Sequence, residues 1–421
     1  MSVFEKHTLD NGLRVLTASM PQAQSVTCFV MLAAGSRYET RETNGIAHFT
    51  EHMVFKGTTK RPTARDIAGE IDAIGGEFNA FTSKEFTGYY VRCSAESRSI
   101  ALNVLVDMLR DSTFDPEEIE REKGVINEEM NMYLDTPRDL IDDIYEGELY
   151  GDQPLGWTVL GRREAISDAS RETFKDYVGR WYTPARMVVG VGGRIGGDLM
   201  GEIESLLGDL QQNGGSAPAP AELPERRKRL KVQHKDSDQA HLCLGAPSYP
   251  IDHPDRYALT LVSTVLGGGM SSRLFTEVRE RRGLAYYVFG INHSYTDAGS
   301  LYSQAGVDIN RIEEAVTTIK DELERIAGET VPSDELEKAR SYAKGRFVLQ
   351  TESPQGMIGF GLRREVLESR VAEPQEVLDG LDAVTAEDVQ RVAGDVLGSD
   401  ALTLAVIGPF EDAERFEKLL D

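Results

Sequence analysis

The chain reads as two halves that run through the same series of predicted elements, and this repetition limits its fold more than any other feature. A segment rich in Gly, Pro and Ala at 211–231 separates the halves and shows no helical periodicity. We therefore expect a first domain at 1–210, a linker at 211–231 and a second domain at 232–421. Each half is long enough to bury a core of its own.

The predicted elements match in kind as well as in order. The first half has an alternating strand (SVTCFVML), a short helix, a hairpin (GGEFNAFTSKEFTGYYVRCSA), a pair of long helices and a closing strand (ARMVVGVGGRI). The second half has AHLCLGAPSY, the helix DRYALTLVSTVLGGG, the hairpin YYVFGINHSYTDAGSLYSQAGV, further helices and the closing strand ALTLAVIGPF. Hairpins join antiparallel strands. The fold class is therefore α+β, with two homologous domains that each hold a mostly antiparallel sheet with helices packed on one face.

Composition and charge exclude several kinds of partner. The chain has 46 Lys and Arg against 70 Asp and Glu, a net charge of −24, whereas nucleic-acid binding needs a basic surface. No apolar run is long enough to span a membrane, and the start of the sequence lacks the pattern of a secretory signal. Cys28, Cys93 and Cys243 lie far apart in apolar stretches, which indicates buried thiols in a reducing compartment. We expect a cytoplasmic protein that contacts neither nucleic acid nor membrane.

The stretch HFTEH at 48–52 places two of the seven histidines one helical turn apart. Asn44 is suited to cap the helix that carries them, and Gly57 to end it. Because residues at i and i+4 share one helix face, His48 and His52 can converge on one metal ion. Glu51 lies beside the pair, where it can accept a proton from water. The alternative is a core helix whose histidines bond to backbone carbonyls.

A zinc site with an open position takes three protein ligands, and the helix IEREKGVINEEMNMY offers two adjacent carboxylates, Glu128 and Glu129. The helical neighbours of Glu129 are apolar or aromatic, namely Val125, Ile126, Met132 and Tyr133. A carboxylate on an apolar stripe is costly unless it is paired or bound to metal, which favours Glu129. Glu122, seven residues earlier, is suited to orient the site. For each carboxylate a solvated helix face is the alternative.

At this point the sequence resembles the pitrilysin/insulinase peptidases (peptidase family M16), including the beta subunit of the mitochondrial processing peptidase. HFTEH matches the inverted zinc motif H-x-x-E-H of that family. The family glutamate follows the second histidine by about 76 residues, and Glu129 lies 77 positions after His52. GGEFNAFTSKEFTGYY, DQPLGWTVLG, WYTPARMVVGVGG and the second half also resemble the family. The resemblance covers essentially the whole chain and implies the LuxS/MPP-like metallohydrolase fold.

The resemblance implies zinc-dependent hydrolysis of peptide bonds. One Zn²⁺ per chain would be held by His48, His52 and Glu129, with Glu122 supporting the site, and Glu51 would act as the general base.

The resemblance also implies residues that contact the substrate. Arg279 and Tyr286 match the Arg/Tyr pair with which the second domain reaches the substrate or its oxyanion, although a basic surface turn is the alternative. Asn79, Ala80 and Phe81 resemble the edge strand to which an extended substrate adds, with an interior hairpin strand as the alternative.

Two acidic residues bear on selectivity. Asp139 and Asp143 occupy positions where the processing-peptidase beta subunit carries acids that recognise an arginine near the cleaved bond. At i and i+4 they share a helix face and can grip a guanidinium, so we expect a preference for basic peptides. A solvated acidic face is the alternative.

The length of the chain bears on assembly. Longer relatives carry four such domains, whereas this chain has two. The resemblance therefore implies a homodimer, or a heterodimer with a related subunit, that closes around peptides or unfolded segments.

Two other functions compete with the peptidase. The first is a non-catalytic scaffold or partner subunit of a peptidase-like complex, which usually lacks the zinc residues that this chain retains. The second is a hydrolase that uses the same inverted motif on a small metabolite. Such chains are much shorter and have no second domain.

Overall fold

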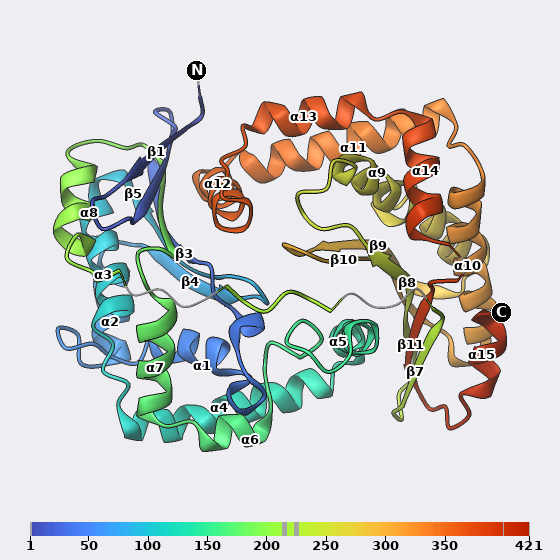
Figure 1. Cartoon of the computed structure of the whole chain (residues 1–421), viewed down its shortest axis with the longest axis horizontal. Coiled ribbons are helices and arrows are strands. Elements are labelled where there is room, and N and C mark those ends of the chain that lie inside the picture. Colours follow the sequence, from blue (N-terminus) through green and yellow to red (C-terminus); the bar gives the residue numbers. More distant parts are fainter. Residues whose placement is uncertain (1, 213–216, 223–226, 399, 421) are drawn as a thin grey trace. The chain divides into compact units, whose positions relative to one another are not determined.

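The structure is a computed structural model and describes residues 2–212, 217–222, 227–398 and 400–420. It consists of two compact units (Figure 1). The first unit comprises Met1–Met130, Trp157–Ala219 and Val348–Pro374, and the second comprises Asn131–Gly156, Pro220–Phe347 and Gln375–Asp421.

The first unit is built on a six-stranded sheet in the order β1-β2-β6-β3-β5-β4. Its strands are β1 (Phe4–Thr8), β2 (Arg14–Ser19), β3 (Ser25–Leu32), β4 (Glu77–Thr82), β5 (Thr87–Ser94) and β6 (Met187–Gly193). Only β2 and β6 run parallel, and the other neighbours are antiparallel. Its helices are α1 (Ile46–Met53), α2 (Ala64–Ala73), α3 (Arg98–Arg110), α4 (Pro116–Leu134, whose last four residues belong to the second unit), α6 (Arg163–Asp168), α7 (Arg171–Trp181), α8 (Leu199–Leu207) and α12 (Pro354–Glu368), with 3₁₀ turns at Ser36–Tyr38, Arg41–Thr43 and Ala95–Ser97.

The second unit repeats this plan with the strand order β7-β11-β8-β10-β9. Its strands are β7 (Arg229–His234), β8 (Ala240–Ser248), β9 (Ala285–Ser294), β10 (Gly299–Val307) and β11 (Thr403–Gly408). Again one pair, β7 and β11, is parallel. Its helices are α5 (Pro137–Tyr150), α9 (Arg256–Gly267), the π-helix η4 (Phe275–Arg281), α10 (Ile312–Gly328), α11 (Ser333–Thr351, which ends in the first unit), α13 (Pro374–Ala383), α14 (Ala386–Val396) and α15 (Glu414–Leu420), with a 3₁₀ turn at Ile309–Arg311.

The matching strand orders confirm the predicted α+β fold with a duplicated, mostly antiparallel sheet. In each unit the closing strand of the half inserts into the sheet: β6 lies between β2 and β3, and β11 lies between β7 and β8. Both predicted hairpins form, as β4–β5 and β9–β10.

The sheet of the first unit is covered on both faces. Along β3, alternate residues enter different cores: Val26, Cys28 and Val30 belong to the core that contains α3, whereas Phe29 and Met31 pack with α12. Strand β6 accommodates α12 through Gly190 and Gly192. A Cβ atom at Gly190 would lie 2.6 Å from Leu362, so only glycine permits this approach. Helices were predicted on one face of the sheet, and α12 in addition covers the opposite face.

Two helices, α5 and α12, are exchanged between the halves of the sequence, and each packs on the sheet of the other half. α12 belongs to the second half yet lies in the first unit, and α5 belongs to the first half yet lies in the second unit, where Ile141 and Tyr145 pack with Cys243 and Tyr302. The units thus differ from the contiguous domains expected at 1–210 and 232–421 by two exchanged segments.

The expected linker at 211–231 lies partly outside the described residues. Residues 217–222 have no regular structure, and strand β7 already begins at Arg229. The basic cluster therefore runs into a strand because Leu230 and Val232 alternate with polar residues.

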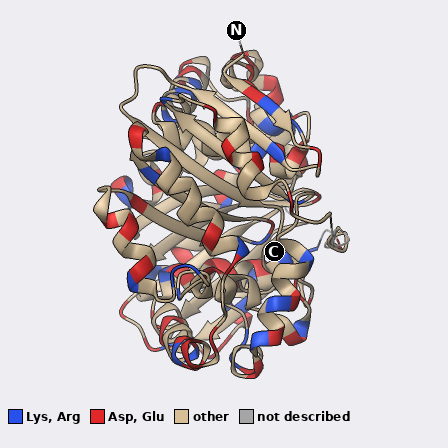
Figure 2. Cartoon of the chain, turned by 90° about the vertical axis from the view of Figure 1, so that its left-hand side faces the viewer, with Lys and Arg blue, Asp and Glu red and all other residues tan. Residues whose placement is uncertain are grey.

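All three cysteines are free and buried, as expected. Among the described residues, no helix combines the length and apolar character needed to cross a bilayer. Figure 2 shows acidic and basic residues interspersed along the ribbon on the side in view.

Candidate metal centre

Helix α1 carries the two histidines and is held by a buried carboxylate at its N-terminus. Glu39 Oε1 accepts a hydrogen bond from the backbone N–H of Ala47 (2.7 Å), and Oε2 accepts one from Gly45 (2.8 Å). Burial raises the pKa of Glu39 to about 8, against the effect of these N–H donors. The prediction that Asn44 caps α1 is wrong. Gly45 is the N-cap, and the Asn44 amide donates to Glu39 Oε2 and to the Thr158 carbonyl.

The backbone at the start of α1 needs glycine. Gly45 has φ 107°, and its Cα packs against Gly161, so neither position has room for a side chain. The prediction that Gly57 ends α1 is wrong: the helix ends at Met53, and Gly57, at φ 148°, lies four residues further on. The apolar side of α1, including Phe49 and Met53, lies in the core. This packing fixes the face on which the histidines lie.

His48, His52 and Glu129 come together between α1 and α4, which lie side by side in Figure 1. Their ligand atoms all lie within 4.8 Å of one another. Glu129 Oε2 is 3.7 Å from His48 Nε2 and 3.6 Å from His52 Nε2. Ligand atoms of a tetrahedral zinc site are about 3.3 Å apart when each bond is about 2.0–2.1 Å. Two imidazole nitrogens and one carboxylate oxygen at this spacing fit a zinc ion.

The two histidines have different surroundings. Burial lowers the pKa of His48 to about 4, and the neighbouring His52 adds to this effect, so His48 is a neutral ring at pH 7. For His52, burial lowers the pKa, but the hydrogen bond with Glu122 and the charge of Glu129 outweigh it and raise the pKa overall. His52 Nδ1 is 2.9 Å from Glu122 Oε1. Glu122 therefore lies where the sequence expects a supporting carboxylate.

Glu51 lies on the same helix turn and bonds to the edge strand. The hydroxyl of Thr82 donates to Glu51 Oε2 at 2.5 Å. Burial raises the pKa of the Glu51 carboxyl group, while the Thr82 hydrogen bond acts in the opposite direction. A raised carboxyl pKa suits a group that takes up and returns a proton near neutral pH.

Glu129 joins the histidines, but the apolar surroundings expected for it are wrong. Val125 is 49% exposed and Met132 is 65% exposed, so no buried apolar stripe surrounds the carboxylate. Glu129 is half-buried and Glu128 is exposed. The position of Glu129 follows from the contact between α4 and α1 and not from the polarity of α4 itself.

Asn79, Ala80 and Phe81 lie on β4, at one edge of the six-stranded sheet. This agrees with the expected edge strand and excludes an interior strand. Thr82, the last residue of β4, holds Glu51. The strand therefore leads directly to the candidate general base.

Arg279 and Tyr286 lie close together in the second unit. Arg279 lies in the last turn of the π-helix η4, and its guanidinium is 5.7 Å from the ring centre of Tyr286 and 4.8 Å from that of Phe275. Tyr286 is 73% exposed. π-Helical turns are frequent at functional sites.

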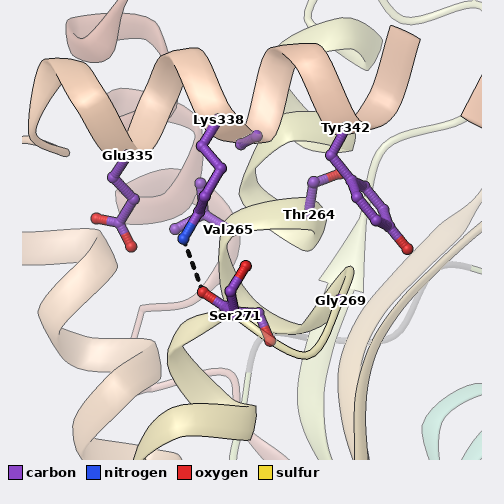
Figure 3. A pocket seen from close by; sticks show the side chains of 9 residues that line it. Thr264, Val265, Gly269, Ser271, Glu335, Lys338 and Tyr342 are labelled. Atoms are coloured by element: carbon purple, nitrogen blue, oxygen red, sulfur yellow. Dashed lines mark hydrogen bonds between the residues drawn. The ribbon is translucent and has the colours of Figure 1, made fainter. Parts of the chain in front are cut away.

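The glycine-rich segment before η4 borders a small cavity of about 40 Å³. Figure 3 shows Lys338 reaching Ser271, whose carbonyl accepts its hydrogen bond at 2.8 Å, with Gly269 and Tyr342 nearby. Gly267 has no room for a Cβ because Gly290 lies against it. The cavity has room for water but not for a peptide.

Asp139 and Asp143 both lie on α5, in the second unit. Asp139 is exposed and Asp143 is half-buried. Asp143 lies near Tyr133. Burial is the largest cause that raises the pKa of Tyr133, and the Asp143 carboxylate raises it further. The two acids share the predicted helix, and their role in recognition stays a prediction.

Three residues around the centre were not predicted, namely Glu39, Lys56 and Thr82. Lys56 Nζ pairs with Glu122 Oε2 at 2.6 Å. Its only signal in the sequence is its place four residues after His52. Glu39 and Thr82 act through contacts that no local spacing indicates.

Two family models match successive parts of the chain. Residues 14–163 match a model described as insulinase (peptidase family M16), and residues 168–342 match one described as peptidase M16 inactive domain. The candidate metal centre lies within the first match.

Curated relatives match over nearly the whole chain. An uncharacterized zinc protease from Bacillus subtilis is 37% identical over 97% of this chain and 98% of its own. One from Streptomyces coelicolor is 34% identical over 97% of this chain and 90% of its own.

Solved structures share the fold. A protease from Helicobacter pylori has a TM-score of 0.90 at 23% identity, and covers 97% of this chain and 100% of its own. A peptidase M16 inactive domain from Pseudomonas fluorescens has a TM-score of 0.89 at 20% identity. The match covers 97% of this chain and 98% of its own.

Proposed function

This chain belongs to the insulinase family of peptidases (family M16), and on that premise we propose that it is a zinc-dependent endopeptidase acting on peptides or unfolded segments. One observation carries the proposal: His48, His52 and Glu129 converge beside the half-buried Glu51. The relatives named as zinc proteases support the same metal.

Each side chain of the centre has one role. Bound zinc would supply a Lewis acid that activates water and polarises the peptide carbonyl. His48 and His52, through Nε2, and Glu129, through its carboxylate, would hold the ion. Glu51, fixed by Thr82, takes a proton from water and returns it to the leaving amine. Arg279 and Tyr286 donate hydrogen bonds to the substrate or its developing oxyanion.

The test compares the native chain with Glu51→Gln. Both proteins should retain zinc by metal analysis, because Glu51 is not a ligand, while Glu51→Gln should lose at least about 100-fold in kcat because the general base is gone. Glu51→Gln protein that cleaves peptides at the native rate would refute the mechanism.

The second match, to an inactive domain, is the observation that favours the alternative of a non-catalytic partner subunit. That match covers residues 168–342, which do not include His48, His52 or Glu129. Among the described residues, these three form the one group suited to a metal. The absence of any cleavage by zinc-loaded native protein would favour the partner-subunit function.

Asp139 and Asp143 support a preference for basic residues near the cleaved bond. Both carboxylates lie on one helix at i and i+4, where they suit a guanidinium. Replacing both with Asn should raise KM for Arg-containing peptides and not for matched peptides with norleucine. If the native and the doubly substituted protein have equal KM values for Arg-containing peptides, the proposed preference is refuted.

A closed dimer completes the proposal. In it, the metal centre of one chain works with Arg279 and Tyr286 of its partner, and closure admits only peptides or unfolded segments. A related subunit in place of the second copy would serve equally.

A further inference from the structure

The metal-binding nitrogen of His52 depends on two groups behind it. Glu122 accepts at Oε1 from His52 Nδ1 (2.9 Å), and a carboxylate can only accept, so the ring proton lies on Nδ1. The lone pair of Nε2 therefore faces Glu129 Oε2, 3.6 Å away. This tautomer is the one that a metal needs.

Nothing comparable orients the other histidine. His48 Nδ1 is buried and has no hydrogen-bond partner among the described residues. The alignment of the pair therefore depends on His52, and thus on how firmly Glu122 is held.

Glu122 is held by Lys56. Only 4% of Glu122 is exposed, and a buried carboxylate is costly without a counter-charge. Lys56 Nζ lies 2.6 Å from Glu122 Oε2, the oxygen that His52 does not use. Lys56 follows α1 by less than one turn, so the cation that holds Glu122 comes from the same segment as His52.

We infer that Lys56 is a positioning residue of the metal centre, which fixes the Glu122 carboxylate and through it the tautomer and direction of His52. The inference rests on the proposed zinc function, and goes beyond it by assigning zinc affinity to a side chain that touches neither metal nor substrate.

The test measures the zinc dissociation constant by competition with a chromophoric chelator, so peptide cleavage is not needed. Lys56→Met should weaken zinc binding about 10- to 100-fold, the usual effect of losing an outer partner. Lys56→Arg keeps the cation and should stay within about threefold of the native value. The matched control is Lys123→Met, because Lys123 neighbours Glu122 in sequence but pairs with Glu120; it should leave the affinity unchanged.

A double-mutant cycle shows whether Lys56 acts through Glu122. Once Glu122→Gln has removed the carboxylate, adding Lys56→Met should weaken zinc binding little further. Independent, multiplying effects of the two changes would overturn the inference, as would a Lys56→Met protein with native affinity.

Lys56→Arg keeps the test open if Lys56→Met does not fold, because a loss of affinity beyond about tenfold in folded Lys56→Arg would also overturn the inference. Native protein that binds zinc tightly but cleaves no peptide would refute the proposed function and leave this inference standing.

Discussion

The hydroxyl of Thr82 connects the expected substrate strand to the expected general base, Glu51. It donates to Glu51 Oε2 and leaves the other carboxylate oxygen for a water molecule. Because Thr82 ends the strand that contains Asn79, Ala80 and Phe81, a peptide added to β4 lies next to the residue that positions Glu51.

Thr82→Val should lower kcat by about tenfold or more with little change in KM or zinc content, because a loosely held general base transfers protons less efficiently. Thr82→Ser keeps the hydroxyl and is the control, expected within about threefold of native kcat. Steady-state kinetics on one peptide gives both constants. A native kcat in Thr82→Val would show that the hydrogen bond does not matter for catalysis.

Local spacing explains which of these residues could be predicted. The pair His48 and His52 follows from helix geometry alone. Glu129 could be chosen only by its distance along the family pattern, since its exposed neighbours Val125 and Met132 give no local reason. Glu39 and Thr82 are joined to the centre by tertiary contacts, which a pattern in one segment does not contain.

At the scale of elements, the exchanged helices α5 and α12 bury acidic side chains in different ways. On α12, Glu365 pairs with Lys6 and Arg14 of the first sheet. On α5, Asp142 accepts from the Cys243 thiol at 3.4 Å, and Glu146 accepts from the Tyr295 hydroxyl at 2.5 Å. Asp142 has only a weak thiol donor, so its partial burial favours the protonated form of its carboxyl group.

This difference predicts a pH dependence of stability. Burial raises the pKa of Asp142 from 3.8 to about 6, although Cys243 and His293 act against it. The folded state then binds the proton more tightly than the unfolded state, so the stabilisation is complete below the unfolded pKa and is lost as pH rises through about 6.

Asp142→Asn should remove this loss. Its free energy of unfolding relative to the native protein should rise from about pH 4 to about pH 6 and stay level above that. Denaturant titrations across this range give the values, with Asp139→Asn as the control for losing an exposed carboxylate of α5. A difference that does not vary with pH would contradict the assignment.

The strands and helices themselves were predictable because period-two alternation and helical periodicity are local. The exchange of α5 and α12 was not, because an amphipathic pattern shows that a helix face is buried but not against which sheet. Close approach of α12 at Gly190 and Gly192 is recognisable only once the partner helix is known.

At the scale of the whole molecule, the chain has two copies of one sheet plan and one described metal group. Residues expected to complete catalysis, Arg279 and Tyr286, belong to the other copy of the plan. The proposed dimer assigns each catalytic site to two chains, and mixed dimers test this directly.

Glu51→Gln and Arg279→Ala proteins should each be inactive alone. In a mixed dimer, one site combines both defects and the other has none, so unfolding and refolding the two together should restore about a quarter of native activity, half of the dimers being mixed with one intact site of two. Sedimentation should give twice the chain mass of 46.5 kDa. Mixtures that stay inactive while mixed dimers form would exclude a shared site.

The convergence of His48, His52 and Glu129 on one ion is tested most directly by anomalous diffraction at the zinc edge from crystals of the zinc-loaded chain. We expect one peak per chain, at about 2.0–2.2 Å from Nε2 of each histidine and from a Glu129 carboxylate oxygen. A zinc-loaded crystal with no peak among these three side chains, or with the ion bound away from Glu129, would contradict it.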